Sequence, residues 1–188
     1  MSTMTAFPEA MRASEHGDAL YEIVNGVRVE LPSMGVYSSF LALALLDFLR
    51  PFARRNQLGR GVNEILFILD KTKDLRRRPD VAFVSVERWA LDRPVPATGD
   101  WPVVPDLAVE VNSPHDLIKD VLAKIHEYFS HGVKQVWLID PDFRQIYVYD
   151  SPTQVRILSD AETLDNTVIP GFSLNIGDLF REVQSERP

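Results

Sequence analysis

Two short runs of almost wholly apolar residues constrain the fold most strongly. They are VAFVSV at 81–86, directly after Pro79-Asp80, and LAVEV at 107–111, directly after Pro105-Asp106. Both are short and rich in β-branched or aromatic residues, which favours strands, and both are apolar enough to lie in the centre of a sheet. Central strands of this kind predict a sheet with helices on its faces.

The flanking segments predict the remaining elements. The alternation on both sides of Asn25-Gly26 predicts a hairpin between 19 and 31, because this dipeptide tolerates the positive φ of a type I′ turn. The segment 38–50 predicts a helix that its serines cap and that Pro51 kinks or ends, and 115–131 predicts an amphipathic helix that Gly132 stops. Further strands are expected at 62–69, 135–140, 145–150 and 154–158.

The order of these elements predicts an α/β (α+β) fold, with a mixed central sheet flanked by helices, an N-terminal β-hairpin and additional C-terminal edge strands. The length of 188 residues fits one domain. We place it at 19–188, after a loose N-terminal arm at 1–18. Because the helix at 38–50 is apolar on almost every side, several of its faces need cover, and we expect a homodimer.

Composition excludes several classes of protein. The chain has no cysteine, which excludes disulfide frameworks, thiolate catalysis and cysteine-ligated metal sites. The most apolar segment, 40–49, falls short of the roughly 20 residues of a membrane-spanning helix, and the N-terminal residues lack a secretory pattern. We therefore expect a cytoplasmic protein without membrane contact. The net charge of -7 counts mildly against a general nucleic-acid binder, although local basic patches can override it.

Three charged residues are candidates for a catalytic site. Glu110 lies inside an apolar run, where an isolated carboxylate is costly unless it is protonated, paired or bound to a metal. Asp80 starts the neighbouring predicted strand, and two such carboxylates suit Mg²⁺ or Mn²⁺. Lys124 lies at the border of the apolar stripe of its helix, from which its ammonium could lean toward Glu110.

Such a triad suits hydrolysis of a phosphodiester. A divalent cation polarises the phosphate and lowers the pKa of a bound water, and a lysine orients that water or stabilises the developing charge. The basic run Arg76, Arg77 and Arg78 directly precedes the predicted site and could contact phosphate, although short runs of charge are more often solvated turns.

Each member of the triad also has a purely structural interpretation. Asp80 could cap a turn after its proline, Glu110 could form an ion pair with Arg78 or Lys124, and Lys124 could pair with Asp120 one turn earlier. Taken singly, each residue fits its structural interpretation about as well as the catalytic one. The catalytic hypothesis therefore depends on all three side chains converging.

The central and C-terminal runs resemble a known family. PDVAFVSVERW, PDLAVEVNSP and KDVLAKIHEYFSHGVKQVWLIDP, followed by IYVYDS, are similar to the bacterial Uma-two family, which is assigned to the restriction-endonuclease-like, PD-(D/E)xK nuclease superfamily. The resemblance extends from YEIVNGVRVELP to PGFSLNIGDLF. It implies a restriction-endonuclease-like domain and metal-dependent phosphodiesterase chemistry.

By position, the resemblance makes Asp80 the first metal-binding aspartate, Glu110 the second acidic residue and Lys124 the lysine of the following helix. It adds the backbone carbonyl of Val111 as a further ligand of the metal. A strict (D/E)xK motif places its lysine at 112, where this chain has Asn112, so that the function of the lysine would move to Lys124 and Asn112 would at most support it.

A further acidic position of the family corresponds to Glu22. This residue could supply another carboxylate or hold the lysine in place, and an exposed hairpin residue is the equally good alternative. The first hypothesis is a dimeric, Mg²⁺- or Mn²⁺-dependent endodeoxyribonuclease. The alternative is a catalytically inactive nuclease-fold module that binds nucleic acid or protein, which the acidic net charge and the missing lysine at 112 favour.

Overall fold

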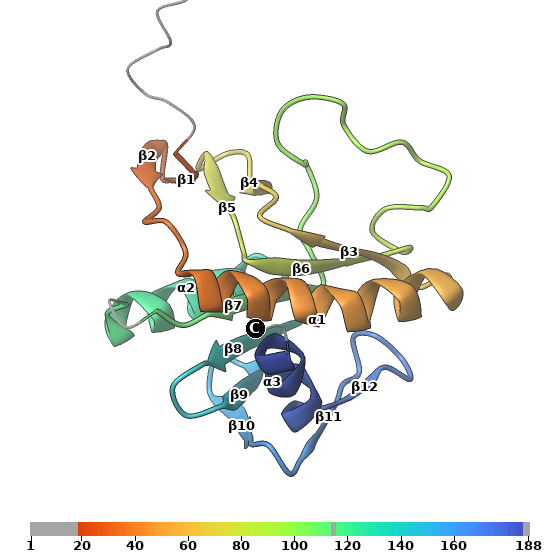
Figure 1. Cartoon of the computed structure of the whole chain (residues 1–188). Coiled ribbons are helices and arrows are strands. Elements are labelled where there is room, and N and C mark those ends of the chain that lie inside the picture. The colour runs from red at the N-terminus through yellow and green to blue at the C-terminus, as the bar shows by residue number, and fades with distance from the viewer. Residues whose placement is uncertain (1–18, 114–115, 186–188) are drawn as a thin grey trace, which may run out of the picture.

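The computed structural model describes residues 19–113 and 116–185, and the N-terminal arm expected at 1–18 lies outside them (Figure 1). A six-stranded sheet forms the centre, in the order β10-β9-β8-β7-β6-β3. Only β7 and β8 are parallel among its pairs, so the sheet is mixed. Its strands are β3 (Gly59–Asn63), β6 (Val81–Ser85), β7 (Leu107–Val111), β8 (Gln135–Asp140), β9 (Gln145–Ser151) and β10 (Gln154–Leu158).

Two smaller sheets and three helices complete the described part. The four-stranded sheet has the order β2-β1-β5-β4, and β11 pairs with β12. The strands are β1 (Tyr21–Val24), β2 (Val27–Glu30), β4 (Phe67–Asp70), β5 (Leu75–Arg77), β11 (Thr163–Asp165) and β12 (Ser173–Asn175). The helices are α1 (Val36–Arg55), α2 (Ile118–Ser130) and α3 (Ile176–Ser185). This mixed α/β architecture confirms the predicted fold class.

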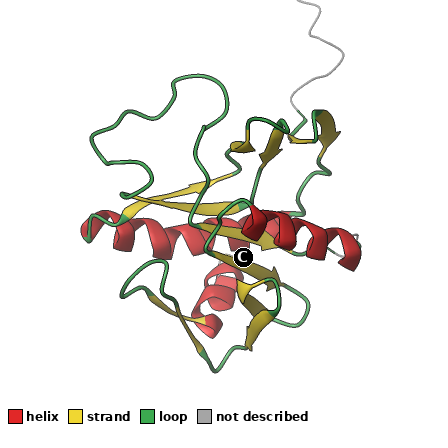
Figure 2. Ribbon diagram, turned by 180° about the vertical axis from the view of Figure 1, so that it is seen from behind, coloured by secondary structure: helices red, strands yellow, loops and turns green. Residues whose placement is uncertain are grey.

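Helices cover both faces of the central sheet, as its apolar strands require. In β6, Val81 and Phe83 pack with α1 and α3 on one face, whereas Ala82 and Val84 pack with α2 and the small sheet on the other. Figure 1 shows α1 along one face beside α3, and Figure 2 shows the molecule from behind, with α2 nearer the viewer. Alternate residues of one strand thus contribute to two cores.

Helix α1 differs from its prediction at both ends. It begins at Val36, and no side chain caps it, because the N-cap residue is Gly35; Ser39 lies inside the helix and donates its hydroxyl to the Gly35 carbonyl. It also continues four residues beyond Pro51. The burial of Ala53 and the edge-to-face contact of Phe52 with Phe172 compensate for the hydrogen bond that proline removes.

Helix α1 is highly apolar, and its burial shows which kind of helix it is. By length and composition it is the one helix among the described residues that could cross a membrane. Leu41, Leu45 and Leu49 are nevertheless fully buried against the sheet, as in the core helix of a globular domain. Its outer side leaves Val36 and Phe40 exposed.

The single strand predicted at 62–69 is wrong. Glu64 has a positive φ of 49°, which ends β3 and sends the chain into β4 of the other sheet.

Helix α2 begins at Ile118 rather than near 115, and residues 114–115 lie outside the described part. Of its predicted apolar stripe, Ile118 is 78% exposed, because only the second half of α2 packs on the sheet. The hairpin at Asn25-Gly26 is confirmed, with positive φ at both residues.

Candidate active site

The site is centred on the end of the antiparallel pair β6 and β7. Val81 pairs with Val109, which places Asp80, just before β6, beside the end of β7. There the Val111 N–H donates to Asp80 Oδ2 at 2.6 Å. The aspartate thus bridges two central strands, and it does not cap a turn after Pro79.

Glu110 lies in β7, and its side chain is on the face of the sheet that α2 covers. Its Oε2 accepts a hydrogen bond from Lys124 Nζ at 2.9 Å, and its Oε1 accepts one from the Tyr128 hydroxyl at 2.6 Å. Lys124 and Tyr128 are four residues apart and therefore share one face of α2. Glu110 forms the predicted ion pair with Lys124, whereas neither an Arg78–Glu110 pair nor a Lys124–Asp120 pair occurs among the described residues.

Glu22 in β1 is the second anchor of the lysine. It is 2% exposed, so its interpretation as an exposed hairpin residue is wrong. Its carboxylate lies 3.1 Å from Lys124 Nζ and 2.6 Å from Arg77 Nη1, and it accepts the Arg78 N–H at 2.9 Å. Arg77 also binds Glu127 of α2. These contacts join the hairpin, β5 and α2 around the lysine.

The predicted phosphate contacts are largely occupied by other partners. Arg76 pairs with Asp74 and Asp100, and Arg77 pairs as described above. Arg78 donates to the carbonyls of Tyr21 and Glu64, and it alone of the three lines the candidate pocket. The run is part of β5 and its continuation rather than a solvated turn.

The electrostatics of the two acidic candidates are unusual. Burial raises the pKa of Asp80 to about 8, and the neighbouring charge of Glu110 adds to this, while the Val111 N–H opposes it. Burial also raises the pKa of Glu110 despite its bond with Lys124. A metal-free site therefore favours the protonated form of the Asp80 carboxyl at neutral pH.

The pKa values of Lys124 and Glu22 shift toward the charged form of each group, unlike those of Asp80 and Glu110. Burial disfavours the charge of Lys124, but Glu110 and Glu22 outweigh it and raise the pKa of the ammonium. Burial likewise opposes ionisation of Glu22, but Lys124 and Arg77 outweigh it and lower the pKa of this carboxyl. Lys124 is thus held as a cation by at least one ionised carboxylate.

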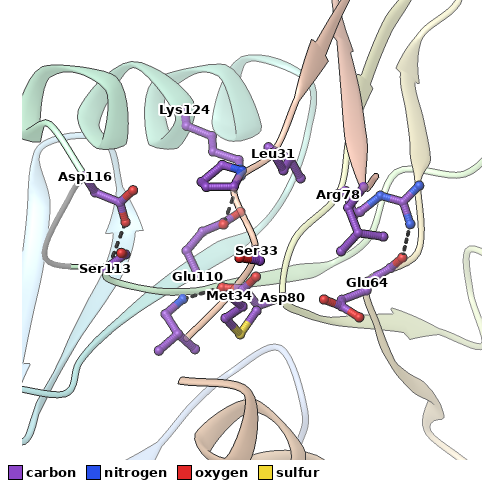
Figure 3. A pocket seen from close by; sticks show the side chains of 13 residues that line it. Leu31, Ser33, Met34, Glu64, Arg78, Asp80, Glu110, Ser113, Asp116 and Lys124 are labelled. Atoms are coloured by element: carbon purple, nitrogen blue, oxygen red, sulfur yellow. Dashed lines mark hydrogen bonds and ion pairs between the residues drawn. The ribbon is translucent and has the colours of Figure 1, made fainter. Parts of the chain in front are cut away.

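A pocket of about 130 Å³ opens at this cluster, and Asp80, Glu110, Val111 and Lys124 line it (Figure 3). A neighbouring depression of about 540 Å³ shares Glu110 and Lys124 and is also lined by Asn112. The backbone N–H of Asn112 donates to the Ile139 carbonyl. The structure thus brings the predicted triad together beside an open cleft. Asn112 lies next to it without a hydrogen bond from its side chain to the described residues.

Glu64 is a pocket residue that the sequence analysis missed. It lines the same pocket, its carboxylate points toward Asp80, and its charge contributes to the raised pKa of Asp80 (Figure 3). The signal was available, because Glu64 is a charged residue within the apolar run at 62–69, as Glu110 is within its own. Glu64 was missed because the segment 62–69 was predicted as one unbroken strand.

The donor set can be tested against a divalent cation. No group of three or more His, Asp or Glu side chains within 19–113 and 116–185 is arranged to hold a metal. Asp80 nevertheless is a half-buried carboxylate beside a second one; its side chain forms no ion pair with a described cation and accepts only one hydrogen bond. Two oxygen donors of this kind fit Mg²⁺ or Mn²⁺, which commonly bind one or two carboxylates and complete their shell with water and phosphate.

Comparisons with known proteins agree with this fold. The model of the Uma2 (Uma-two) family, described as "Putative restriction endonuclease", matches residues 6–177. A crystal structure of a "putative nuclease belonging to DUF820" from Anabaena variabilis is similar with a TM-score of 0.72 and 20% identity, over 87% of this chain and 90% of that chain. At this identity the likeness shows the fold alone. None of the curated proteins compared with the chain matches it.

Proposed function

Since the chain belongs to the Uma2 family, we propose that it is a divalent-metal-dependent endonuclease that hydrolyses phosphodiester bonds of DNA. The observation that carries this proposal is the convergence on one pocket of Asp80, just before β6, Glu110 of β7 and Lys124 of α2. These three residues lie far apart in the sequence, and each alone had a structural interpretation. Their common position beside an open cleft supports the catalytic one.

Asp80 and Glu110 would hold Mg²⁺ or Mn²⁺, with the Val111 carbonyl as a further ligand. The bound cation would polarise the scissile phosphate and supply a water of lowered pKa. Asp80 suits this role because it lies beside another carboxylate and forms no ion pair with a cation among the described residues. Tyr128 orients Glu110 through its hydrogen bond to Oε1.

Lys124 would stabilise the charge that develops on the phosphate. A lysine ammonium has three N–H donors; Lys124 donates one to Glu110 and forms an ion pair with Glu22. A remaining donor would be available for a phosphate oxygen or for the attacking water. Because Glu22 and Glu110 fix the ammonium from two sides, its position needs little reorganisation during the reaction. We assign Glu22 a positioning role through this contact.

The test is cleavage of supercoiled plasmid DNA with Mg²⁺ or Mn²⁺, compared with EDTA. We expect Glu110→Gln and Lys124→Ala to lower the rate of nicking at least about a hundredfold, the order seen when a transition-state contact is removed. Lys134→Ala is the control for Lys124→Ala, since Lys134 pairs with Asp106 and Glu87 outside the pocket. It should nick at the wild-type rate.

The rival hypothesis is an inactive nuclease-fold module. The absence of a three-residue metal cluster within 19–113 and 116–185 favours it. Folded wild-type protein that cleaves no DNA or RNA with either metal would exclude the endonuclease and support this module. Equal nicking by wild type and Glu110→Gln would instead show that the activity does not come from this site.

A further inference from the structure

A cluster of arginines lies at the opposite end of α1 from the candidate pocket. Three come from α1, one from β3 and one from the segment 86–106, and we call them the arginine patch: Arg50, Arg54, Arg55, Arg60 and Arg93. The first four line an open depression of about 850 Å³, and Arg60 donates to the carbonyl of Arg93. Figure 1 shows this end of α1 beside β3 and the 86–106 segment.

The patch is not neutralised by carboxylates. None of the five arginines forms a salt bridge in the part of the chain that the structure describes. By contrast, Arg76, Arg77, Arg88 and Arg144 are each paired with aspartate or glutamate. In a chain of net charge -7, five unpaired cations create a positive local field that acts within about 8–10 Å at physiological salt.

Contacts with the backbone and an aromatic ring fix part of this charge. Arg60 donates to the carbonyls of Trp89, Ala90 and Leu91 at 2.7–3.1 Å, and the Arg93 guanidinium lies 3.4 Å from the centre of the Trp89 ring. These contacts hold the 86–106 segment against β3. The positive charge of Arg60 and Arg93 is thus in place before any ligand binds.

Arg54 and Arg55 are the free members of the patch. Both side chains are exposed, and their guanidinium groups donate to no acceptor among the described residues. Their position at the C-terminal end of α1 suits the helix dipole, but this explanation does not extend to Arg60 or Arg93, which lie outside the helix. A free guanidinium presents a planar fork that binds two phosphate oxygens at once.

The patch is connected to the candidate pocket along the contact between α1 and β3. Arg50 donates to the Gly61 carbonyl at 2.9 Å and to Asn63 Oδ1 at 3.3 Å. Asn63 in turn lines a hollow of about 90 Å³ with Leu43 and Asp80. Leu43 and Arg54 are eleven residues apart on α1, which corresponds to about 16 Å. This length equals about five nucleotides at about 3.4 Å per nucleotide.

We propose that the arginine patch binds the sugar–phosphate backbone of a nucleic acid, about five nucleotides from the phosphate at Asp80 and Glu110. The position of the scissile phosphate rests on the proposed function, whereas binding by the patch does not. A nucleic acid is favoured over an acidic polypeptide because its phosphates recur at every nucleotide, so that one strand reaches the patch and the pocket together. The arginine forks also match phosphate geometry.

The test measures binding in EDTA, where metal-dependent cleavage cannot occur. Fluorescence anisotropy with a labelled 20-base-pair DNA duplex, at several salt concentrations, compares wild type with Arg54→Ala/Arg55→Ala. Loss of two phosphate contacts should weaken binding at least tenfold at low salt and reduce the slope of log K against log salt by about 1.8. Arg54→Lys/Arg55→Lys should restore most of that slope.

A charge-matched control separates the patch from net charge. Arg156→Ala/Arg181→Ala removes two arginines that pair with aspartates elsewhere, and it should bind like wild type. Equal weakening by both double variants, or no weakening by Arg54→Ala/Arg55→Ala, would overturn the proposal. So would a failure of wild type to bind duplex or single-stranded DNA while it binds polyglutamate through the patch.

The result is independent of the cleavage assay. Binding that depends on the patch, without cleavage in Mg²⁺ or Mn²⁺, would retain this inference and remove the proposed function. Metal-dependent cleavage at the wild-type rate by Arg54→Ala/Arg55→Ala, with unchanged binding, would retain the function and remove this inference.

Discussion

Replacement of Asp80 by asparagine should stabilise the metal-free protein at neutral pH. Burial and Glu110 raise the pKa of Asp80 in the folded chain from 3.8 to about 8, so that folding takes up one proton between these values. At pH 7 the folded carboxyl is mostly protonated, whereas the unfolded chain is stabilised by ionisation. Asparagine removes this advantage of the unfolded chain and still accepts the Val111 N–H.

The magnitude follows from the two pKa values. Each pH unit between them costs about 1.4 kcal/mol, so wild type loses up to about 4 kcal/mol of stability between pH 4 and pH 7 through this group. The sign is that of an acid with a raised folded pKa: stability falls as pH rises from about 4 to about 8. Asp80→Asn should therefore match wild type near pH 4 and exceed it increasingly toward pH 8.

Urea unfolding in EDTA at several pH values measures this difference as a shift of the midpoint at constant m-value. Asp106→Asn is the control, because burial raises the pKa of Asp106, but the Ser85 N–H, Lys134 and Arg88 outweigh burial and lower it. It should be destabilised at neutral pH, by an amount that shrinks as pH falls below about 4. A difference between wild type and Asp80→Asn that is constant from pH 4 to pH 8 would refute the reasoning.

Three further predictions concern stability and assembly. Glu22→Gln should lower the free energy of unfolding by about 3–5 kcal/mol at pH 7, because Lys124 and Arg77 lose a buried charged partner. Urea unfolding should show that this loss shrinks below the unfolded pKa of about 4.5. Gly61→Ala should cost about 1–3 kcal/mol, since its Cβ would lie 2.3 Å from a methyl of Leu49, and thermal unfolding would measure it. If the expected homodimer forms through the exposed side of α1, Phe40→Glu should shift sedimentation to the monomer without a change in helix content.

The sequence predicted the centre of the fold better than its periphery. The strands β6 and β7 could be located because a short apolar run has few other solutions than a strand buried on both faces. The split at Glu64 could not, because a left-handed residue other than glycine leaves no clear compositional mark. Strand β5 was missed for another reason: it has only three residues, two of them arginines, and they become a strand only by pairing with β1 and β4.

The same distinction applies to the candidate site. Glu110 could be identified from sequence because its cost of burial is local, and its neighbours in β7 are all apolar. The reversal of the expectation for Glu22 depends on tertiary structure, since only the approach of α2 and β5 buries this hairpin residue. The arginine patch is also tertiary, because α1, β3 and the 86–106 segment each contribute arginines that look like ordinary surface residues.

The arrangement around Lys124 separates the supporting from the reacting groups. Glu22 has a lowered pKa and three partners, which are Lys124 of α2, Arg77 of β5 and the Arg78 backbone N–H, so its ionised form stabilises the domain. Asp80 has a raised pKa and one hydrogen bond, so its ionised form weakens the domain unless a cation binds. On the proposed function, metal binding would explain why a carboxylate is kept at such a cost beside a well-supported lysine. Addition of Mg²⁺ should accordingly stabilise wild type more than Asp80→Asn.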